Sequence, residues 1–251
     1  MTRIPDSFST DAEALNGKII LVTGATGGFG RAISLACAKH GATVILLARN
    51  LRLVEGLYDE IERAGFPQPA IYPMDLQGAT EHDYQDLAQN IEKEFGRLDG
   101  LIHCAAVLGA PTPFEHSDTE TWYQVHQVNL HAPYLLTRSV IPLLKDAPRA
   151  SLVFMTDAKP GAYWDAYSVS KQALATMAQL LAAEYEGSSI RVNCVNPGKT
   201  ATALQVRAFP AADDNDSLPT PEDRLDTFLY LMSDELQENG ESSQPRSLRS
   251  K

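Results

Sequence analysis

The chain has 251 residues, of which 44% are hydrophobic, and its formal charge at pH 7 is −11. This length suits one α/β domain with a buried core, and the acidic balance argues against nucleic acid, which needs clustered Lys and Arg. No apolar run reaches ~18 residues, so we expect no membrane span.

The first residues, MTRIPDSFSTDAEALNG, lack the apolar segment of a signal peptide. The three cysteines show neither disulfide nor metal-ligand spacing and fall inside predicted core elements; they are Cys37, Cys104 and Cys194. We therefore expect a cytoplasmic protein without a metal site. Residues 1–16 are polar and are predicted to be a flexible lead-in.

A glycine-rich turn follows the first predicted strand. Ile19–Val22 is a short apolar run typical of a buried parallel strand, and residues 31–40 have the pattern of a helix. Between them lie four glycines, Gly24, Gly27, Gly28 and Gly30. Such a turn points backbone N–H groups at a phosphate, and glycine lets the phosphate approach closely. The stretch therefore predicts a dinucleotide site.

Strands and helices alternate along the rest of the chain. Further strands are predicted at 43–47, 70–74, 101–106, 151–155 and 190–195, and further helices at 51–64, 81–95, 119–144, 167–186 and 224–232. Pro133 should bend or break the long helix. The alternation predicts α/β architecture, with a single Rossmann-type doubly wound parallel sheet flanked by helices over residues 17–237.

The C-terminal sequence gives no clear seventh strand. Residues 238–251, ENGESSQPRSLRSK, contain no apolar run, so we expect a disordered tail and a sheet of six strands.

Tyr167 and Lys171 are four residues apart on a predicted helix, which places both on one face. A nearby ammonium group favours the phenolate, and such a phenol can exchange a proton with a substrate oxygen. The same spacing also occurs on ordinary amphipathic helices.

Several motifs in order resemble the short-chain dehydrogenase/reductase family over residues 18 to about 205. They are the glycine turn Thr23–Gly30, Asp75, His103–Ala106, Asn129, Tyr167 with Lys171, and NCVNPG at 193–198. The runs RLDGLIHCAAVLG, SLVF, RVNCVNPG and TPEDRLDTFLYLM resemble the bacterial subgroup of YciK-type oxidoreductases.

This resemblance implies hydride transfer between NAD(P)(H) and a small carbonyl or alcohol substrate. It implies Tyr167 as general acid/base, Lys171 as the group that lowers the Tyr167 pKa, and Asn129 as the holder of a relay water. The cofactor-binding residues that it implies are Thr23, Gly24, Gly28, Phe29, Gly30, Arg49, Asp75, Leu76, Cys104, Ala105, Ala106, Tyr167, Lys171, Pro197, Gly198, Thr200 and Thr202. The two long helices are candidate surfaces for a homodimer, whereas the family's tetramer is not expected without a seventh strand.

The end of the second predicted strand favours NADP(H) over NAD(H). The family's NAD-dependent members carry an Asp there, which binds the ribose hydroxyls. This chain has Arg49 instead, and an arginine attracts a 2′-phosphate.

Two positions depart from the family pattern. The family's Asn-Asn-Ala-Gly is His103-Cys104-Ala105-Ala106, which should weaken cofactor contacts, with His103 as a buried structural residue. The family's catalytic Ser falls at Asp157, after Thr156. An ionised Asp cannot donate a hydrogen bond to an oxyanion and should raise the Tyr167 pKa.

Three outcomes remain open for this position. Thr156 supplies the hydroxyl through a shift in register, Asp157 stays protonated and donates, or turnover is reduced or lost. In the last case the chain is an NADP(H)-binding module that acts as a sensor or interaction protein.

Overall fold

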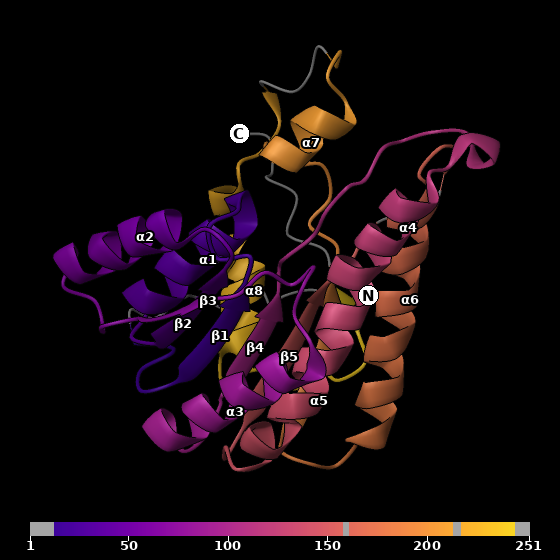
Figure 1. The fold of residues 1–251 in the computed structure, drawn as a ribbon. Coiled ribbons are helices and arrows are strands. Elements are labelled where there is room, and N and C mark those ends of the chain that lie inside the picture. The colour runs from indigo at the N-terminus through magenta and orange to yellow at the C-terminus, as the bar shows by residue number, and fades with distance from the viewer. Residues whose placement is uncertain (1–12, 158–160, 213–216, 244–251) are drawn as a thin grey trace.

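Seven parallel strands form one sheet in the computed structural model, which describes residues 13–157, 161–212 and 217–243. The strand order is β3-β2-β1-β4-β5-β6-β7, and Figure 1 labels the first five strands of this order. Their bounds are β1 Ile19–Thr23, β2 Thr43–Ala48, β3 Ala70–Pro73, β4 Gly100–His103, β5 Ala150–Met155, β6 Ile190–Val195 and β7 Ser242–Ser243.

Helices cover both faces of the sheet, because side chains along each strand alternate between two apolar cores. Ile20 packs with α1 (Gly28–Lys39), α2 (Leu51–Arg63) and α8 (Leu225–Met232). Leu21 faces the other core, with α3 (Glu81–Phe95), α5 (Ala132–Lys145) and α6 (Asp165–Glu184). Shorter helices are α4 (Thr119–His126), α7 (Ala203–Ala208) and the 3-10 turns Phe114–His116 and Pro221–Arg224. The predicted doubly wound parallel sheet is confirmed.

The long helix predicted at 119–144 is interrupted before its proline. A π-helical segment, Gln127–His131, separates α4 from α5, and Pro133 lies in the first turn of α5. Proline has no N–H for the carbonyl four residues earlier, which is that of Asn129, so the regular hydrogen-bond ladder cannot continue there. The wider turn therefore falls on Asn129.

The prediction of six strands and a tail disordered from residue 238 is wrong. Ser242 and Ser243 pair with Cys194 and Val195 of β6. The Asn239 side chain also forms a hydrogen bond with β6, because its Oδ1 accepts from the Val192 N–H at 2.9 Å. Further backbone bonds run from Gly240 to Val192, from Cys194 to Glu241 and from Asn196 to Ser243. Hydrogen bonds, rather than an apolar run, hold this strand. Residues 244–251 lie outside the described part of the chain.

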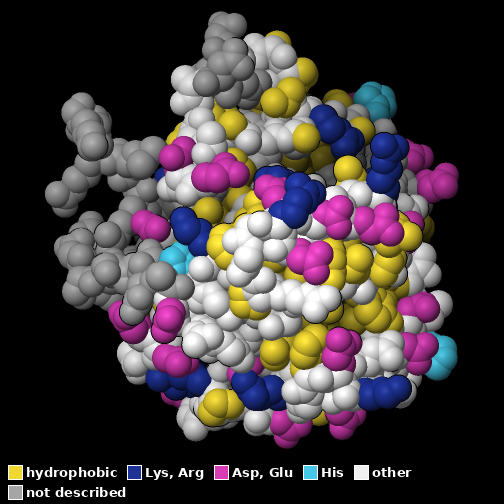
Figure 2. Space-filling view, turned by 90° about the vertical axis from the view of Figure 1, so that its left-hand side faces the viewer, with side chains coloured by type: hydrophobic (Ala, Val, Ile, Leu, Met, Phe, Trp, Pro, Cys, Tyr) yellow, Lys and Arg dark blue, Asp and Glu magenta, His cyan; other side chains and the backbone are white. Residues whose placement is uncertain are grey.

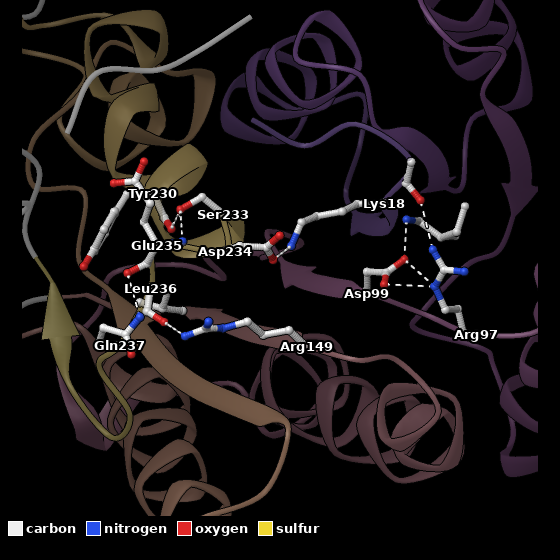
Figure 3. A network of polar contacts seen from close by, with 12 residues as sticks. Lys18, Arg97, Asp99, Arg149, Tyr230, Ser233, Asp234, Glu235, Leu236 and Gln237 are labelled. Carbon is white, nitrogen blue, oxygen red and sulfur yellow. Dashed lines mark hydrogen bonds and ion pairs between the residues drawn. The ribbon is translucent and has the colours of Figure 1, made fainter. Parts of the chain in front are cut away.

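A polar network ties the C-terminal segment to the amino edge of the sheet (Figure 3). Lys18, before β1, pairs with Asp234 at 2.6 Å, and Arg149, before β5, donates to the Leu236 carbonyl. Asp99, before β4, accepts from the Ile19 N–H at 2.8 Å. The contacts of Lys18 and Arg149 hold residues 233–237 near the amino ends of β1 and β5.

The lead-in prediction is wrong for its last residues. Leu15 is fully buried in the core, and its N–H donates to the His40 carbonyl at 3.0 Å. Residues 13–16 therefore belong to the domain, and residues 1–12 lie outside the described ranges.

Candidate active site

The carboxyl ends of β1, β4, β5 and β6 lie side by side at one edge of the sheet. The helices that follow β1 and β4 pack on opposite faces of the sheet, α1 with one core and α5 with the other. Ligands of open α/β sheets bind at such a change of direction, outside the carboxyl ends of the strands.

The glycine turn is built for close backbone approach. Gly24 has φ +64°, and a Cβ there would lie 2.9 Å from Ala105 Cα; a Cβ on Gly30 would lie 2.1 Å from the Gly24 oxygen. The N-cap of α1 is Gly27, which provides no side-chain hydrogen bond to the first helical N–H groups. The positive end of α1 thus meets this edge without a side-chain cap, an arrangement that fits a pyrophosphate.

Thr23 joins the glycine turn to the end of β4. Its Oγ1 accepts hydrogen bonds from the N–H groups of Cys104 and Ala105, at 3.1 and 3.2 Å. His103 is buried, stacks on Phe154 with ring centroids 4.8 Å apart and shares a 2.9 Å hydrogen bond with Thr137. Burial lowers the pKa of His103 to about 3. The contacts and burial are those of a structural histidine, as predicted.

Tyr167 and Lys171 both face the ends of β5 and β4 from the start of α6. Both are buried, and the Lys171 ammonium lies 5.9 Å from the centroid of the Tyr167 ring. Lys171 Nζ donates to the Met155 carbonyl at 2.8 Å. The Tyr167 hydroxyl donates to Asp157 Oδ2, also at 2.8 Å.

The charges around Tyr167 favour the protonated phenol. Burial, followed by the charge and hydrogen bond of Asp157, raises the pKa of Tyr167 far above its ordinary value. Burial lowers the pKa of Lys171 to about 8, partly opposed by Asp157. The pKa of Tyr167 is therefore raised, mainly by burial, and Asp157 adds to the rise as expected, whereas the lowering expected from Lys171 is not among the causes.

Thr156 does not take the place of the family serine. Its hydroxyl donates to the Val195 carbonyl at 3.3 Å, and its backbone N–H donates to the same oxygen at 2.8 Å. Asp157 is the residue in contact with Tyr167. The alternative in which Thr156 supplies the hydroxyl finds no support in this geometry.

Asn129 clamps the loop after β4. Its amide nitrogen donates to the Val107 carbonyl at 2.9 Å and to Ser170 Oγ at 3.1 Å, and its Oδ1 accepts from the Val107 N–H. Ser170 in turn donates to the Tyr167 carbonyl. The Asn129 side chain thus holds the loop after β4 against α6.

The loop after β6 reaches the glycine turn. The Thr202 methyl lies 3.1 Å from the point where a Gly28 Cβ would stand, and the Thr202 hydroxyl accepts from the first turn of α7. Thr200 is buried, and its hydroxyl donates to the carbonyl of Gly198, which has φ +68°. Pro197 is half-buried beside them.

Two aromatic residues that sequence reasoning missed lie beside Tyr167. The Trp164 ring centroid is 5.9 Å from that of Tyr167 and 5.4 Å from that of Phe209, which follows α7. Trp164 lies just before Tyr167 in the chain, a position that could have suggested it. Phe209 lies in an irregular loop whose sequence gives no such signal.

The remaining predicted residues are at the ends of β2 and β3. Arg49 is exposed after β2, directly before Asn50, whose side chain caps α2. Asp75 is exposed after β3, accepts from the Gln77 N–H at 3.1 Å and precedes the buried Leu76. Both strand ends belong to the same sheet edge as the glycine turn.

The last predicted cofactor-binding residues lie after β4 and in α1. Cys104, Ala105 and Ala106 are half-buried at the end of β4, and Phe29 packs against the ring of Phe228.

The family model for short-chain dehydrogenases matches residues 18–213. The chain belongs to the short-chain dehydrogenase family. It is 41% identical to the oxidoreductase YciK of Escherichia coli K12 over 91% of each chain. A short-chain dehydrogenase structure from Pseudomonas syringae is 42% identical, with a TM-score of 0.92, and covers 94% of this chain and 98% of its own.

A short-chain dehydrogenase structure from Shigella flexneri, described as complexed with NADP, is 39% identical, with a TM-score of 0.90. The match covers 93% of this chain and 99% of that chain. The resemblance found in the motifs is thereby confirmed, and the chain is a member of an oxidoreductase family.

The surface of the chain carries charges of both signs. On the face that bears α2, Lys and Arg side chains stand among Asp and Glu side chains (Figure 2). Within the described ranges, no cluster of three His, Cys, Asp or Glu residues could hold a metal ion, and no helix could cross a membrane.

Proposed function

We propose that this chain is an NADP(H)-dependent oxidoreductase that transfers a hydride between the nicotinamide and a small molecule. The family resemblance points to a carbonyl or alcohol group as the reacting group. The observation that carries the proposal is the convergence of Tyr167 and Lys171 at the strand edge that also bears the glycine turn. When bound, the nicotinamide supplies or accepts the hydride.

The residues at this end of the sheet would divide the binding work. The N–H groups at the start of α1, that of Phe29 among them, would hold the pyrophosphate, with Gly24, Gly28 and Gly30 allowing close approach. The adenine would lie against Asp75 and Leu76. The nicotinamide end would lie against two segments, Cys104 to Ala106 and Pro197 to Thr202. Lys171 would hold the ribose, and Tyr167 would exchange a proton with the substrate.

Arg49 is proposed to select NADP(H). Its side chain is exposed at the end of β2, where a guanidinium group can bind the 2′-phosphate. The NADP complex of the Shigella flexneri relative supports this choice. Arg49→Ala should weaken NADPH binding about 10- to 100-fold, the loss expected for a charge-assisted hydrogen bond, and leave NADH binding unchanged. Arg63→Ala, at the far end of α2, is the matched control.

The second candidate function is an NADP(H)-binding module with little or no turnover. The hydrogen bond from Tyr167 to Asp157 favours it, since the phenol proton is held by a carboxylate. Isothermal titration with NADPH and NADH, followed by NADPH oxidation with a panel of carbonyl compounds, separates the two. Turnover that is lost in Tyr167→Phe supports the enzyme. NADPH binding without turnover, restored by Asp157→Ser, supports the module.

A further inference from the structure

The group that contacts the proposed proton donor is an acceptor of hydrogen bonds. Asp157 Oδ2 accepts from the Tyr167 hydroxyl at 2.8 Å, and the Asp157 side chain is exposed. A carboxylate offers no proton to a substrate oxygen, and its charge opposes a second negative charge beside it. Reduction of C=O builds negative charge on oxygen, so this site is poorly suited to a ketone.

A positively charged reacting group would be attracted by the Asp157 carboxylate. A protonated C=N bond carries an N–H donor and a positive charge, both of which match a carboxylate. Lys171 donates to the Met155 carbonyl, and Lys199 lies 5.7 Å from the Phe209 ring centroid. Asp157 is thus the charged group that contacts the Tyr167 hydroxyl itself, where the reacting bond would lie.

Two further aromatic rings continue from Tyr167, the residue that contacts this carboxylate, and favour a flat ligand. Trp164 lies between Tyr167 and Phe209, at centroid distances of 5.9 and 5.4 Å. Trp164 is half-buried and Phe209 is 37% exposed, so both rings retain accessible surface. Ring faces attract planar molecules and cations alike.

We infer that the substrate is a planar molecule whose reacting bond is a protonated C=N, such as a cyclic imine or a partly reduced nitrogen heterocycle. The inference rests on the hydride transfer of the proposed function, and it assigns a C=N bond as the reacting group in place of the carbonyl or alcohol that the family resemblance points to. It assigns Asp157 as the residue that binds the C=N–H group and favours its protonated form.

The reaction balances with the reduced nicotinamide as the electron donor. The carbon of the C=N bond accepts a hydride and forms a C–H bond, the π-electron pair becomes the nitrogen lone pair, and the nicotinamide is oxidised. The product is an amine that keeps the N–H hydrogen. Asp157 keeps its negative charge throughout, and the Tyr167 hydroxyl holds it in place through their hydrogen bond.

A matched pair of substrates tests the inference in the NADPH-loaded enzyme. We expect 3,4-dihydroisoquinoline to be reduced with a kcat/KM about tenfold or more above that of the ketone 1-tetralone. This ratio corresponds to the free energy of one charge-assisted hydrogen bond. Asp157→Ser should lower the imine value about 10- to 100-fold and raise the ketone value. Asp146→Asn, which removes an exposed charge after α5, should change neither.

A binding measurement checks the same point without turnover. Quenching of tryptophan fluorescence should show the cation of 1,2,3,4-tetrahydroisoquinoline binding about tenfold more tightly than neutral tetralin, and Asp157→Asn should remove that preference. A ketone preference, or an imine rate unaffected by Asp157→Ser, would overturn the inference and leave the proposed reductase standing. NADPH binding with no turnover of either substrate would overturn both.

Discussion

The Tyr167 hydroxyl donates a 2.8 Å hydrogen bond to Asp157 Oδ2, which joins the first turn of α6 to the end of β5. The phenol is buried and the carboxylate is exposed. The pair therefore sets both the charge that meets a ligand and the protonation state of the phenol.

Replacement of Tyr167 by Phe should abolish most of the turnover. The change removes the hydroxyl that would exchange a proton with a carbonyl or alcohol substrate, or would position Asp157 for an imine substrate, and general acid/base groups contribute about 10²- to 10⁴-fold in rate. The NADPH dissociation constant and the melting temperature should stay near those of the wild type. Steady-state NADPH oxidation measures the loss; a variant with full activity would exclude Tyr167 from the mechanism.

Lys171 should make stability rise with pH between about 8 and 10.5. Burial lowers its folded-state pKa from 10.5 to about 8, so the unfolded chain binds the extra proton in that window. The free-energy cost of burying the protonated Lys171 is therefore fully present below about pH 8 and absent above about pH 10.5. Lys171→Met lacks this cost, so the stability of the wild type relative to the variant should improve by about 3 kcal/mol across the window. Urea unfolding at both ends of the window measures the difference, and no change would show that Lys171 titrates normally.

Gly30 and Gly56 should respond oppositely to alanine. A Cβ on Gly30 would overlap the Gly24 oxygen at 2.1 Å, so Gly30→Ala should distort the glycine turn and abolish NADPH binding. Gly56 lies inside α2 with nothing within 4 Å of its Cβ position. Gly56→Ala should raise the free energy of unfolding by about 0.5–1 kcal/mol, from helix propensity alone. Calorimetry and NADPH titration test the pair, and equal behaviour would contradict the turn geometry.

Asn239 should hold the C-terminal segment on the sheet. Its side chain accepts from the Val192 N–H and donates to the Ala182 carbonyl, at 2.9 and 2.8 Å. Asn239→Ala leaves both backbone groups unpaired, at a cost of about 1–3 kcal/mol each where they are shielded from water. Gln237→Ala, at an exposed position of the same segment, should cost little. Denaturant unfolding compares the two, and equal costs would assign the docking to backbone contacts alone.

The central strands could be predicted because their apolar runs are continuous. A parallel strand buried on both faces needs such a run, as in Ile19–Val22 of β1 and Val44–Ala48 of β2. The seventh strand escaped prediction because Ser242 and Ser243 carry no apolar signal; side-chain and backbone hydrogen bonds specify it.

The site was partly predictable for a related reason. The glycine turn and the Tyr167–Lys171 spacing are local patterns, so their chemistry can be inferred from neighbours in the chain. The contacts of Asp157 with Tyr167 and of Trp164 with Phe209 join separate elements, and no local pattern encodes them. The clamp made by Asn129 likewise depends on the loop after β4 and on Ser170.

The segment that contains β7 also occupies backbone groups of β6 that another strand could otherwise pair with. Asn239 fills the hydrogen-bonding position beside Val192 with an amide from its side chain, in place of a further strand residue. The side of β6 that faces the 238–243 segment therefore offers an incoming peptide little backbone to pair with, which disfavours aggregation and strand exchange between copies through β6. Direct pairing of a second copy with β6 would first require the 238–243 segment to detach.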